Sequence, residues 1–198
     1  GAVTRYVFEC FARARKLSQR NDEPERASRP FDRDRDGGLV SEGSGVVVLE
    51  RLENALARGA EPYCEIAGYG TCADPSGSEV AGGMARAMER AMVNAAVSSE
   101  DIDHVNAHAP SDPHMDTLET RLIKNVLGDR AYRIPVVSIK GVTGNPMGVG
   151  GAHQLISSAL AIRNGIVPPT ANLENPDPEC DLDYVPEGAR PLQVNTAL

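Results

Sequence analysis

The sequence predicts an α/β fold in which a mixed, mostly parallel sheet is flanked by helices. Short β-rich runs alternate with amphipathic segments of roughly ten to twenty residues, which is the pattern of βα units. Glycines stand where several of these segments stop, as they do at helix ends. Since ligands bind beyond the carboxyl ends of the strands in such sheets, the segments to search are 106–112 and 140–151.

The first part of the chain predicts two helices, a loop and two strands. Apolar residues recur at helical spacing between Val3 and Leu17, which predicts an amphipathic helix there. Residues 19–38 are charged and rich in turn formers, so we expect a solvated loop that buries little. The other elements expected in this part are a buried strand at 45–50, a helix at 51–58 that stops at Gly59, and a strand at 63–71.

The second part of the chain carries clearer helix signals. Asp112 followed by Pro113 is a typical helix start, and Gly128 is a typical stop. A methionine stripe between Ser78 and Val97 predicts a helix whose methionines fill the core. The remaining expectations are strands at 104–107 and 134–139, a glycine-dense loop at 141–151, a helix at 152–164 capped by Gly165, an irregular segment at 168–184 and a last strand at 192–198.

Composition excludes several classes of protein. The chain has 28 acidic and 20 basic side chains and a formal net charge of −8, which disfavours a nucleic-acid partner because such binding needs clustered Lys and Arg. Its four cysteines are widely spaced, so we expect reduced thiols and a cytoplasmic protein. No apolar run reaches the ~18 residues of a membrane span, and no leader is evident from Gly1 onward. The absence of an initial Met suggests a piece of a longer chain.

Two metal-site patterns are incomplete. Asp32, Asp34 and Asp36 copy the first positions of a calcium loop, but Gly43 stands where a bidentate Glu is required. His104 and His108 are four residues apart in a β-like segment, where that step spans roughly 13 Å, too far for one zinc ion. We therefore predict no metal and no cofactor.

Two polar residues stand at predicted strand ends, and a third lies in the loop that follows one of them. His108 follows one strand, Lys140 follows another, and Asn145 lies five residues later in the glycine loop that contains Gly144. Glycines let backbone approach a ligand closely, and amides at a helix start can face it. These residues are candidates for a site, although a lone His or Lys is often only structural.

Five segments together resemble the elongating beta-ketoacyl-acyl-carrier-protein synthases. They run in the order of that family over nearly the whole chain: RPFDRDRDG at 29–37, SEGSGVVVLERLENALARGA at 41–60, VNAHA at 105–109, SIKGVTGNPMGVGGA at 138–152 and VPPTANLENPDPECDLDYVP at 167–186. The resemblance implies the C-terminal half of a thiolase-like fold. We expect residues 1–44 to form a helix and charged loop leading into a half-domain at 45–198, with the final segment missing.

The resemblance also implies chemistry. The histidine and lysine of the family site fall on His108 and Lys140, and a second family histidine falls on Asn145. The implied reaction is decarboxylation of a malonyl thioester followed by attack of the carbanion on an acyl-cysteine. Donors must then face a developing enolate oxygen, and a neutral imidazole or a carboxamide can donate there.

Three further positions depart from the family pattern. Two threonines that bond the pantetheine arm fall on Pro110 and Asp112, so these two residues and Gly144 are the substrate-contact positions expected here. A glutamate that pairs with the lysine falls on Gln154, which predicts a Lys140 without its counter-ion. The pattern is that of a divergent member.

The resemblance further implies partners. These are an acyl carrier protein, acyl and malonyl thioesters, a missing N-terminal half with the nucleophilic cysteine, and a homodimer in the full-length family. We therefore expect the isolated chain to be inactive. One alternative is a non-catalytic partner subunit or acyl-chain-binding module, favoured by Pro110, Asp112 and Gln154. A second is a calcium-binding protein, which rests only on residues 32–37.

Overall fold

A small parallel sheet lies at the centre of the computed structural model, which describes residues 3–74 and 82–198. Strand β1 (Val105–Asn106) pairs in parallel with β2 (Val136–Val137). Single parallel bridges extend the sheet on both sides, from His104 to Ala197 and from Pro135 to Asp183. The expected α/β class and the mostly parallel sheet are thus confirmed, although the regular strands are short.

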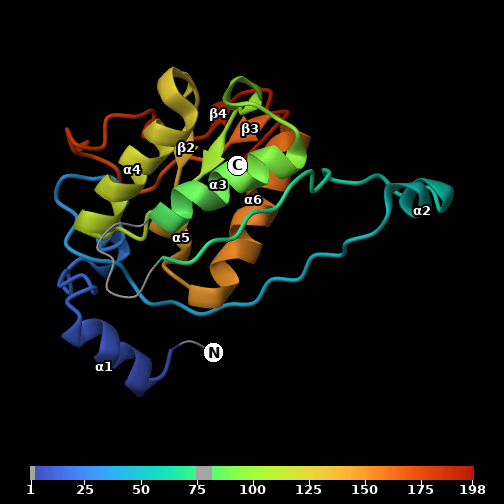
Figure 1. The fold of residues 1–198 in the computed structure, drawn as a ribbon. Helices are drawn as coiled ribbons and strands as arrows, with labels where there is room; N and C mark the ends of the chain where they lie inside the picture. Colours follow the sequence, from blue (N-terminus) through green and yellow to red (C-terminus); the bar gives the residue numbers. More distant parts are fainter. Residues whose placement is uncertain (1–2, 75–81) are drawn as a thin grey trace.

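Helices cover both faces of this sheet, as Figure 1 shows. Neighbouring side chains of a strand point to opposite faces. Val136 accordingly belongs to the larger core cluster, where α4 (Pro113–Leu127) packs beside α3 (Gly82–Ala95). Val137 belongs to a second cluster, against which Ile162 of α6 (Gly150–Asn164) packs. The carboxyl edge of the sheet therefore lies between two layers of helices.

Local signals set the helix ends as predicted. The Asp112 carboxylate caps α4 by accepting from the backbone N–H of His114 (3.1 Å) and Met115 (2.9 Å), and Gly128 ends that helix. Gly165 ends α6 in the left-handed conformation, at φ +63°. Met88 and Met92 of α3 pack against the core, as the methionine stripe predicts, while the expected helix start at Ser78 lies outside the described residues.

The remaining elements are short. They are α1 (Arg5–Arg13), α2 (Leu52–Ala57), α5 (Lys140–Thr143), the antiparallel pair β3 (Ile166–Val167) and β4 (Arg190–Pro191), and 3-10 turns at Pro24–Arg26, Ser99–Asp101, Gly128–Arg133 and Met147–Val149. The last strand expected at 192–198 is reduced to the bridge at Ala197, with β4 just before it. Among the described helices none is long and apolar enough to cross a membrane.

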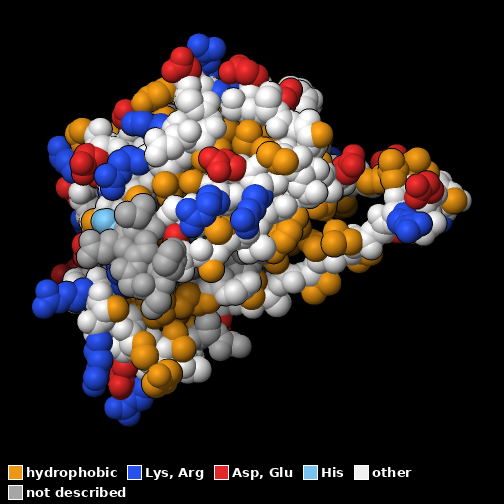
Figure 2. All heavy atoms as spheres, in the orientation of Figure 1, with side chains coloured by type: hydrophobic (Ala, Val, Ile, Leu, Met, Phe, Trp, Pro, Cys, Tyr) orange, Lys and Arg blue, Asp and Glu red, His pale blue; other side chains and the backbone are white. Residues whose placement is uncertain are grey.

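The strand expected at 45–50 is wrong. Residues 45–62, here called the arm, extend from the body and carry α2 at the tip (Figure 1). Val46 and Val48 are 86% and 85% exposed, and hydrophobic side chains gather along the arm in Figure 2. A strand needs a hydrogen-bonded neighbour, and no described segment pairs with this one.

The strand expected at 63–71 is also wrong, because this segment packs on a helix instead. The backbone N–H of Tyr69 donates to the Asn94 side chain (3.0 Å), and Arg90 donates to the Thr71 carbonyl (2.7 Å). A Cβ on Gly70 would lie 2.0 Å from the Ala87 carbonyl oxygen, so glycine is required for this close approach to α3. The glycines that suggested an interrupted strand therefore mark a helix contact.

Candidate active site

The carboxyl ends of β1 and β2 bring together the loops that carry His108 and Lys140. His108 follows β1 by two residues and Lys140 begins α5 just after β2. Ser138 joins the loops, because its hydroxyl donates to the Ala109 carbonyl (2.9 Å) and accepts from the Lys140 backbone N–H (3.3 Å). The predicted placement of His108 and Lys140 on neighbouring strand ends is confirmed.

A buried carboxylate holds the backbone of the loop that carries His108. Glu119, in the second turn of α4, accepts from the backbone N–H groups of His108 (2.7 Å) and Ala109 (2.6 Å). Burial, assisted by the positive charge of Lys140, lowers the pKa of the His108 imidazole to about 4. At neutral pH the ring is therefore uncharged and carries one N–H donor.

Lys140 lies behind this loop and is 1% exposed. Its Nζ has no hydrogen-bond partner among the described residues. Burial lowers the pKa of Lys140, and the nearby carboxylates of Glu119 and Asp116 oppose that effect. We expect Lys140 to lack its counter-ion because residue 154 is Gln, and no described side chain hydrogen-bonds its ammonium group. Glu119 and Asp116 lie close enough to influence its pKa but form no direct ion pair with it.

Gln154 has a structural role instead. Its side-chain amide donates to the carbonyls of Asn106 (2.8 Å) and Ala107 (2.9 Å) at the end of β1. The side chain of Asn106 in turn donates to the Gln154 carbonyl (3.1 Å). These hydrogen bonds of Gln154 thus connect α6 to β1, the strand that leads into His108.

Gly144 positions Asn145. Gly144 has φ +64°, and a Cβ there would lie 2.9 Å from the Cβ of Ser41. This close approach lets the Asn145 backbone N–H donate to the Leu39 carbonyl (2.7 Å), while the Ser41 N–H donates to the Asn145 carbonyl (3.1 Å). The glycine therefore acts through the backbone, and its own atoms are not among those that line the cavity described next.

A cavity of about 510 Å³, here called the His108 cavity, lies at this edge of the sheet. It brings together four of the six predicted site residues, namely His108, Asn145, Pro110 and Asp112. Lys140 and Gly144 lie outside its lining. The other residues that line it are Phe11, Lys16, Leu17, Gly38, Leu39, Val40, Met115 and Met147. Phe11 and Lys16 were missed in the sequence, since no local pattern places the first helix and the residues just after it beside residues about a hundred positions away.

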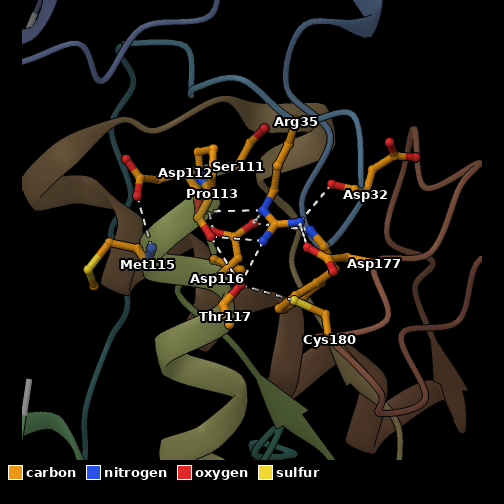
Figure 3. Close-up of polar contacts among 12 residues, drawn as sticks. Asp32, Arg35, Ser111, Asp112, Pro113, Met115, Asp116, Thr117, Asp177 and Cys180 are labelled. Atoms are coloured by element: carbon orange, nitrogen blue, oxygen red, sulfur yellow. Dashed lines mark hydrogen bonds and ion pairs between the residues drawn. The ribbon is translucent and has the colours of Figure 1, made fainter.

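The start of α4 is clamped by Arg35, as Figure 3 shows. The Arg35 guanidinium donates to Asp177 (2.6 Å), to the Pro113 carbonyl (2.9 Å) and to the Thr117 hydroxyl (2.9 Å). It also forms an ion pair with Asp116 (3.6 Å), whose pKa is raised to about 7 mainly by burial. This network fixes the helix that bears Asp112 and Glu119.

The expectation of a solvated loop at 19–38 is therefore wrong for its second half. Asp32 is fully buried, and its side chain accepts from the backbone N–H groups of residues 34, 174 and 175 (2.8 Å each). Asp36 binds Ser18 and the Gln19 backbone N–H. The carboxylates that resemble a calcium loop are thus engaged by protein donors, and no cluster suited to a metal occurs among the described residues. The buried charges are tolerated because each has specific partners.

Two family models match the chain. The model of the beta-ketoacyl synthase C-terminal domain matches residues 63–174, and that of the N-terminal domain matches residues 2–55. The chain belongs to the beta-ketoacyl synthase family. A curated relative, 3-oxoacyl-[acyl-carrier-protein] synthase 2 of Synechocystis sp., is 47% identical over 100% of this chain and 48% of its own length. This beta-ketoacyl synthase chain thus spans about half the length of the curated relatives it matches.

Polyketide enzymes are comparably similar. The tetracenomycin polyketide synthase ketoacyl synthase alpha subunit of Streptomyces glaucescens is 45% identical over 99% of the chain and 47% of its own length. A solved complex of a type II polyketide acyl-carrier protein with its ketosynthase matches with a TM-score of 0.94, 32% identity, and coverage of 100% and 50% of the two chains. A beta-ketoacyl synthase of Burkholderia phymatum matches with a TM-score of 0.91 and 35% identity over 97% and 47%. These solved structures support the expected thiolase-like fold.

Proposed function

We propose that this chain supplies the enolate-stabilising part of a beta-ketoacyl synthase active site, for fatty acid or polyketide synthesis. The observation that carries the proposal is the presence of His108 and Asn145 in the lining of one cavity, with the buried Lys140 close enough to influence the His108 ring. An uncharged imidazole and a carboxamide are both N–H donors. Two N–H donors that line one cavity suit an oxygen on which negative charge develops during reaction.

The proposed reaction is a decarboxylative Claisen condensation. The bond between the malonyl α-carbon and its carboxylate breaks, CO₂ leaves, and the electron pair forms an enolate on the thioester. His108 and Asn145 donate hydrogen bonds to the enolate oxygen. The α-carbon then attacks the carbonyl of an acyl-cysteine, and the cysteine leaves as thiolate, which gives a 3-oxoacyl thioester.

Lys140 is proposed to act through charge. Burial of the His108 ring is the main cause of its low pKa, and the positive charge of Lys140 is the second cause. A neighbouring cation disfavours protonation of the ring. Lys140 thereby helps to keep His108 in the neutral form, while Glu119 anchors the backbone at His108 and Ala109.

The nucleophilic cysteine is proposed to come from outside these 198 residues. None of Cys10, Cys64, Cys72 and Cys180, all of which are described, lines the His108 cavity. Acyl and malonyl groups are proposed to arrive on an acyl carrier protein, as the names of the Synechocystis relative and of the polyketide complex suggest. A homodimer of the complete synthase and the domain boundary between residues 44 and 45 also remain proposals.

A second candidate is a non-catalytic partner that binds acyl chains. Apolar side chains make up much of the cavity lining, and Pro110 offers no donor to a substrate. Such a partner would bind an acyl thioester without stabilising an enolate. Its binding would then not depend on the donors of His108 and Asn145.

A hybrid synthase tests the proposal. The part of the Synechocystis relative that lies outside the aligned region is joined to this chain, and release of CO₂ from malonyl-acyl carrier protein is measured. We expect decarboxylation that falls by about 10² to 10³ in His108→Ala, the usual loss for one such donor. His114→Ala, which changes an exposed histidine, is the matched control.

The outcomes separate the two candidates. A folded hybrid that binds acyl thioesters but releases CO₂ equally slowly with and without His108 would favour the non-catalytic partner. A loss in His114→Ala as large as that in His108→Ala would show a general loss of folding. Circular dichroism of each variant checks that the fold is retained.

A further inference from the structure

An ion pair lies in the lining of the His108 cavity, together with the donors used above. The Lys16 ammonium donates to Oδ2 of Asp112 at 2.7 Å, and both residues belong to the lining. The two residues are 96 positions apart, so the fold and not local sequence joins them. The side chain of Asp112 is 7% exposed and that of Lys16 is 43% exposed. Lys16 therefore lies at the rim, between the cavity and solvent.

Asp112 is held as a carboxylate. Its Oδ1 accepts the two amides at the start of α4, and its Oδ2 accepts Lys16. Burial alone would raise the pKa of Asp112, but the Lys16 hydrogen bond and the amides together lower it. Asp112 thus carries a full negative charge in the wall, and Lys16 is the cation that balances it.

Charge in this wall acts over a long range, because little else there is polar. Apart from the ion pair, the polar side chains of the lining are His108 and Asn145. The apolar side chains are Phe11, Leu17, Leu39, Val40, Pro110, Met115 and Met147. Apolar walls screen a charge less than water does. An unbalanced Asp112 would therefore repel any anionic ligand in the cavity.

The backbone around Lys16 is fixed opposite Asp112. The Gly38 N–H donates to the Lys16 carbonyl (2.9 Å), and the Ser18 N–H donates to the Gly38 carbonyl (3.0 Å). Gly38 lies against Pro110, whose carbonyl oxygen would be 2.4 Å from a Cβ on residue 38. Lys16 is thereby placed by the same loop that approaches the His108 segment.

We propose that Lys16 sets the charge selectivity of the His108 cavity by cancelling the charge of Asp112, so that a thioester bearing a carboxylate is admitted. The inference rests on the proposed function for the identity of the ligand. Lys16 acts here through Asp112 and has no role in the enolate chemistry. Its positive charge offsets the repulsion between the Asp112 carboxylate and an anionic substrate.

Binding by the 198-residue chain tests this. Dissociation constants of malonyl-pantetheine and acetyl-pantetheine are measured by calorimetry for the wild type, Lys16→Gln, Asp112→Asn and the double variant. Asn also caps helices, so α4 is retained. The malonyl-to-acetyl ratio of dissociation constants should rise about three- to tenfold in Lys16→Gln, fall by a similar factor in Asp112→Asn, and return to the wild-type value in the double variant.

A second readout does not depend on any thioester. In Lys16→Gln the pKa of Asp112, followed by NMR of the side-chain carboxyl, should rise. An unchanged pKa, an equal ratio in all four proteins, or no malonyl binding by the wild type would each overturn the inference. If the hybrid synthase depends on His108 but the malonyl-to-acetyl ratio of dissociation constants is the same in all four proteins, the proposed function is retained and the role of Lys16 is excluded. If the ratio changes as expected but the hybrid synthase does not depend on His108, the role of Lys16 is retained and the proposed function is excluded.

Discussion

At the scale of single residues, the proposed site depends on two neutral donors, and buried charges place only one of them, His108. His108 is uncharged because its ring is buried near Lys140, and its backbone is held by Glu119. Asn145 reaches the same cavity from another loop, through its backbone bonds to residues 39 and 41. The two donors therefore depend on separate parts of the fold, and each can be removed without the other.

Asn145 should contribute as a donor in the hybrid synthase. Asn145→Ala and Asn145→Asp should both lower malonyl decarboxylation, by a factor up to about 10² to 10³, because each removes the carboxamide N–H. The measurement is the rate of CO₂ release, with the exposed Asn195→Ala as control. Rates equal to the parent in both variants would exclude the donor role. A near-zero parent rate that Asn145→His raises strongly would show that this one residue had switched the enzyme off.

His108 should make stability depend on pH. Its pKa is about 4 in the folded chain against 6.5 for the ordinary side chain. Between these values the unfolded chain binds a proton that the folded chain does not, so the contribution of His108 to stability falls as the pH drops from about 6.5 to 4. The advantage of wild type over His108→Gln in free energy of unfolding should shrink between pH 7 and pH 5. An advantage that grows would contradict the assignment, and the exposed His114→Gln serves as control.

At the scale of elements, the loop that carries Asn145 contains its own matched pair of glycines. Gly144 has positive φ and no room for a Cβ, whereas a Cβ on Gly148 would meet nothing within 4 Å. Gly144→Ala should therefore destabilise the chain by about 1–3 kcal/mol. Gly148→Ala should change stability by less than about 0.5 kcal/mol. Denaturant unfolding of the two variants measures the difference, and equal stabilities would show that Gly144 does not constrain the loop.

Helices were easier to predict than strands for a physical reason. The ends of α4 and α6 follow from signals in the adjoining residues, Asp112, Gly128 and Gly165. A strand requires a partner that can be far away, so the apolar runs at 45–50 and 63–71 misled the prediction. Residues 45–50 belong to the exposed arm, and residues 63–71 pack on α3.

The same difference between local signals and distant partners applies to the site. His108, Lys140 and Asn145 were predicted from short motifs, while their supports were not. Lys16 pairs with Asp112, and Arg35 with Asp116 and Asp177, across long stretches of sequence. Charged residues in a turn-rich segment are usually solvated. Their burial becomes visible only when all partners are placed.

At the scale of the whole molecule, no thiol lines the His108 cavity among the residues that the structure describes. We expect no transfer of an acyl group to any of its four cysteines faster than to a free thiol. Burial raises the pKa of Cys64 and Cys180, which reduces their reactive thiolate fraction. Intact mass after incubation with an acyl thioester, compared with N-acetylcysteine, measures this. Acylation of one cysteine well above that reference would show that the chain carries a nucleophile of its own.

The pairing of the sheet also bears on how quickly the protein reaches its native state. β1 has β2 on one side and residues 197–198 on the other, and β2 has residue 183 beyond it, so neighbours in space are distant in sequence. Closing such long loops costs entropy before any contact compensates for it. The helices α4 and α6 can form early from local contacts, and β1 can pair with β2 across α4, while the outer positions of the sheet must wait for residues 183–198. Refolding should consequently be slow for a chain of this size, and the rate-limiting step should be the docking of that late segment.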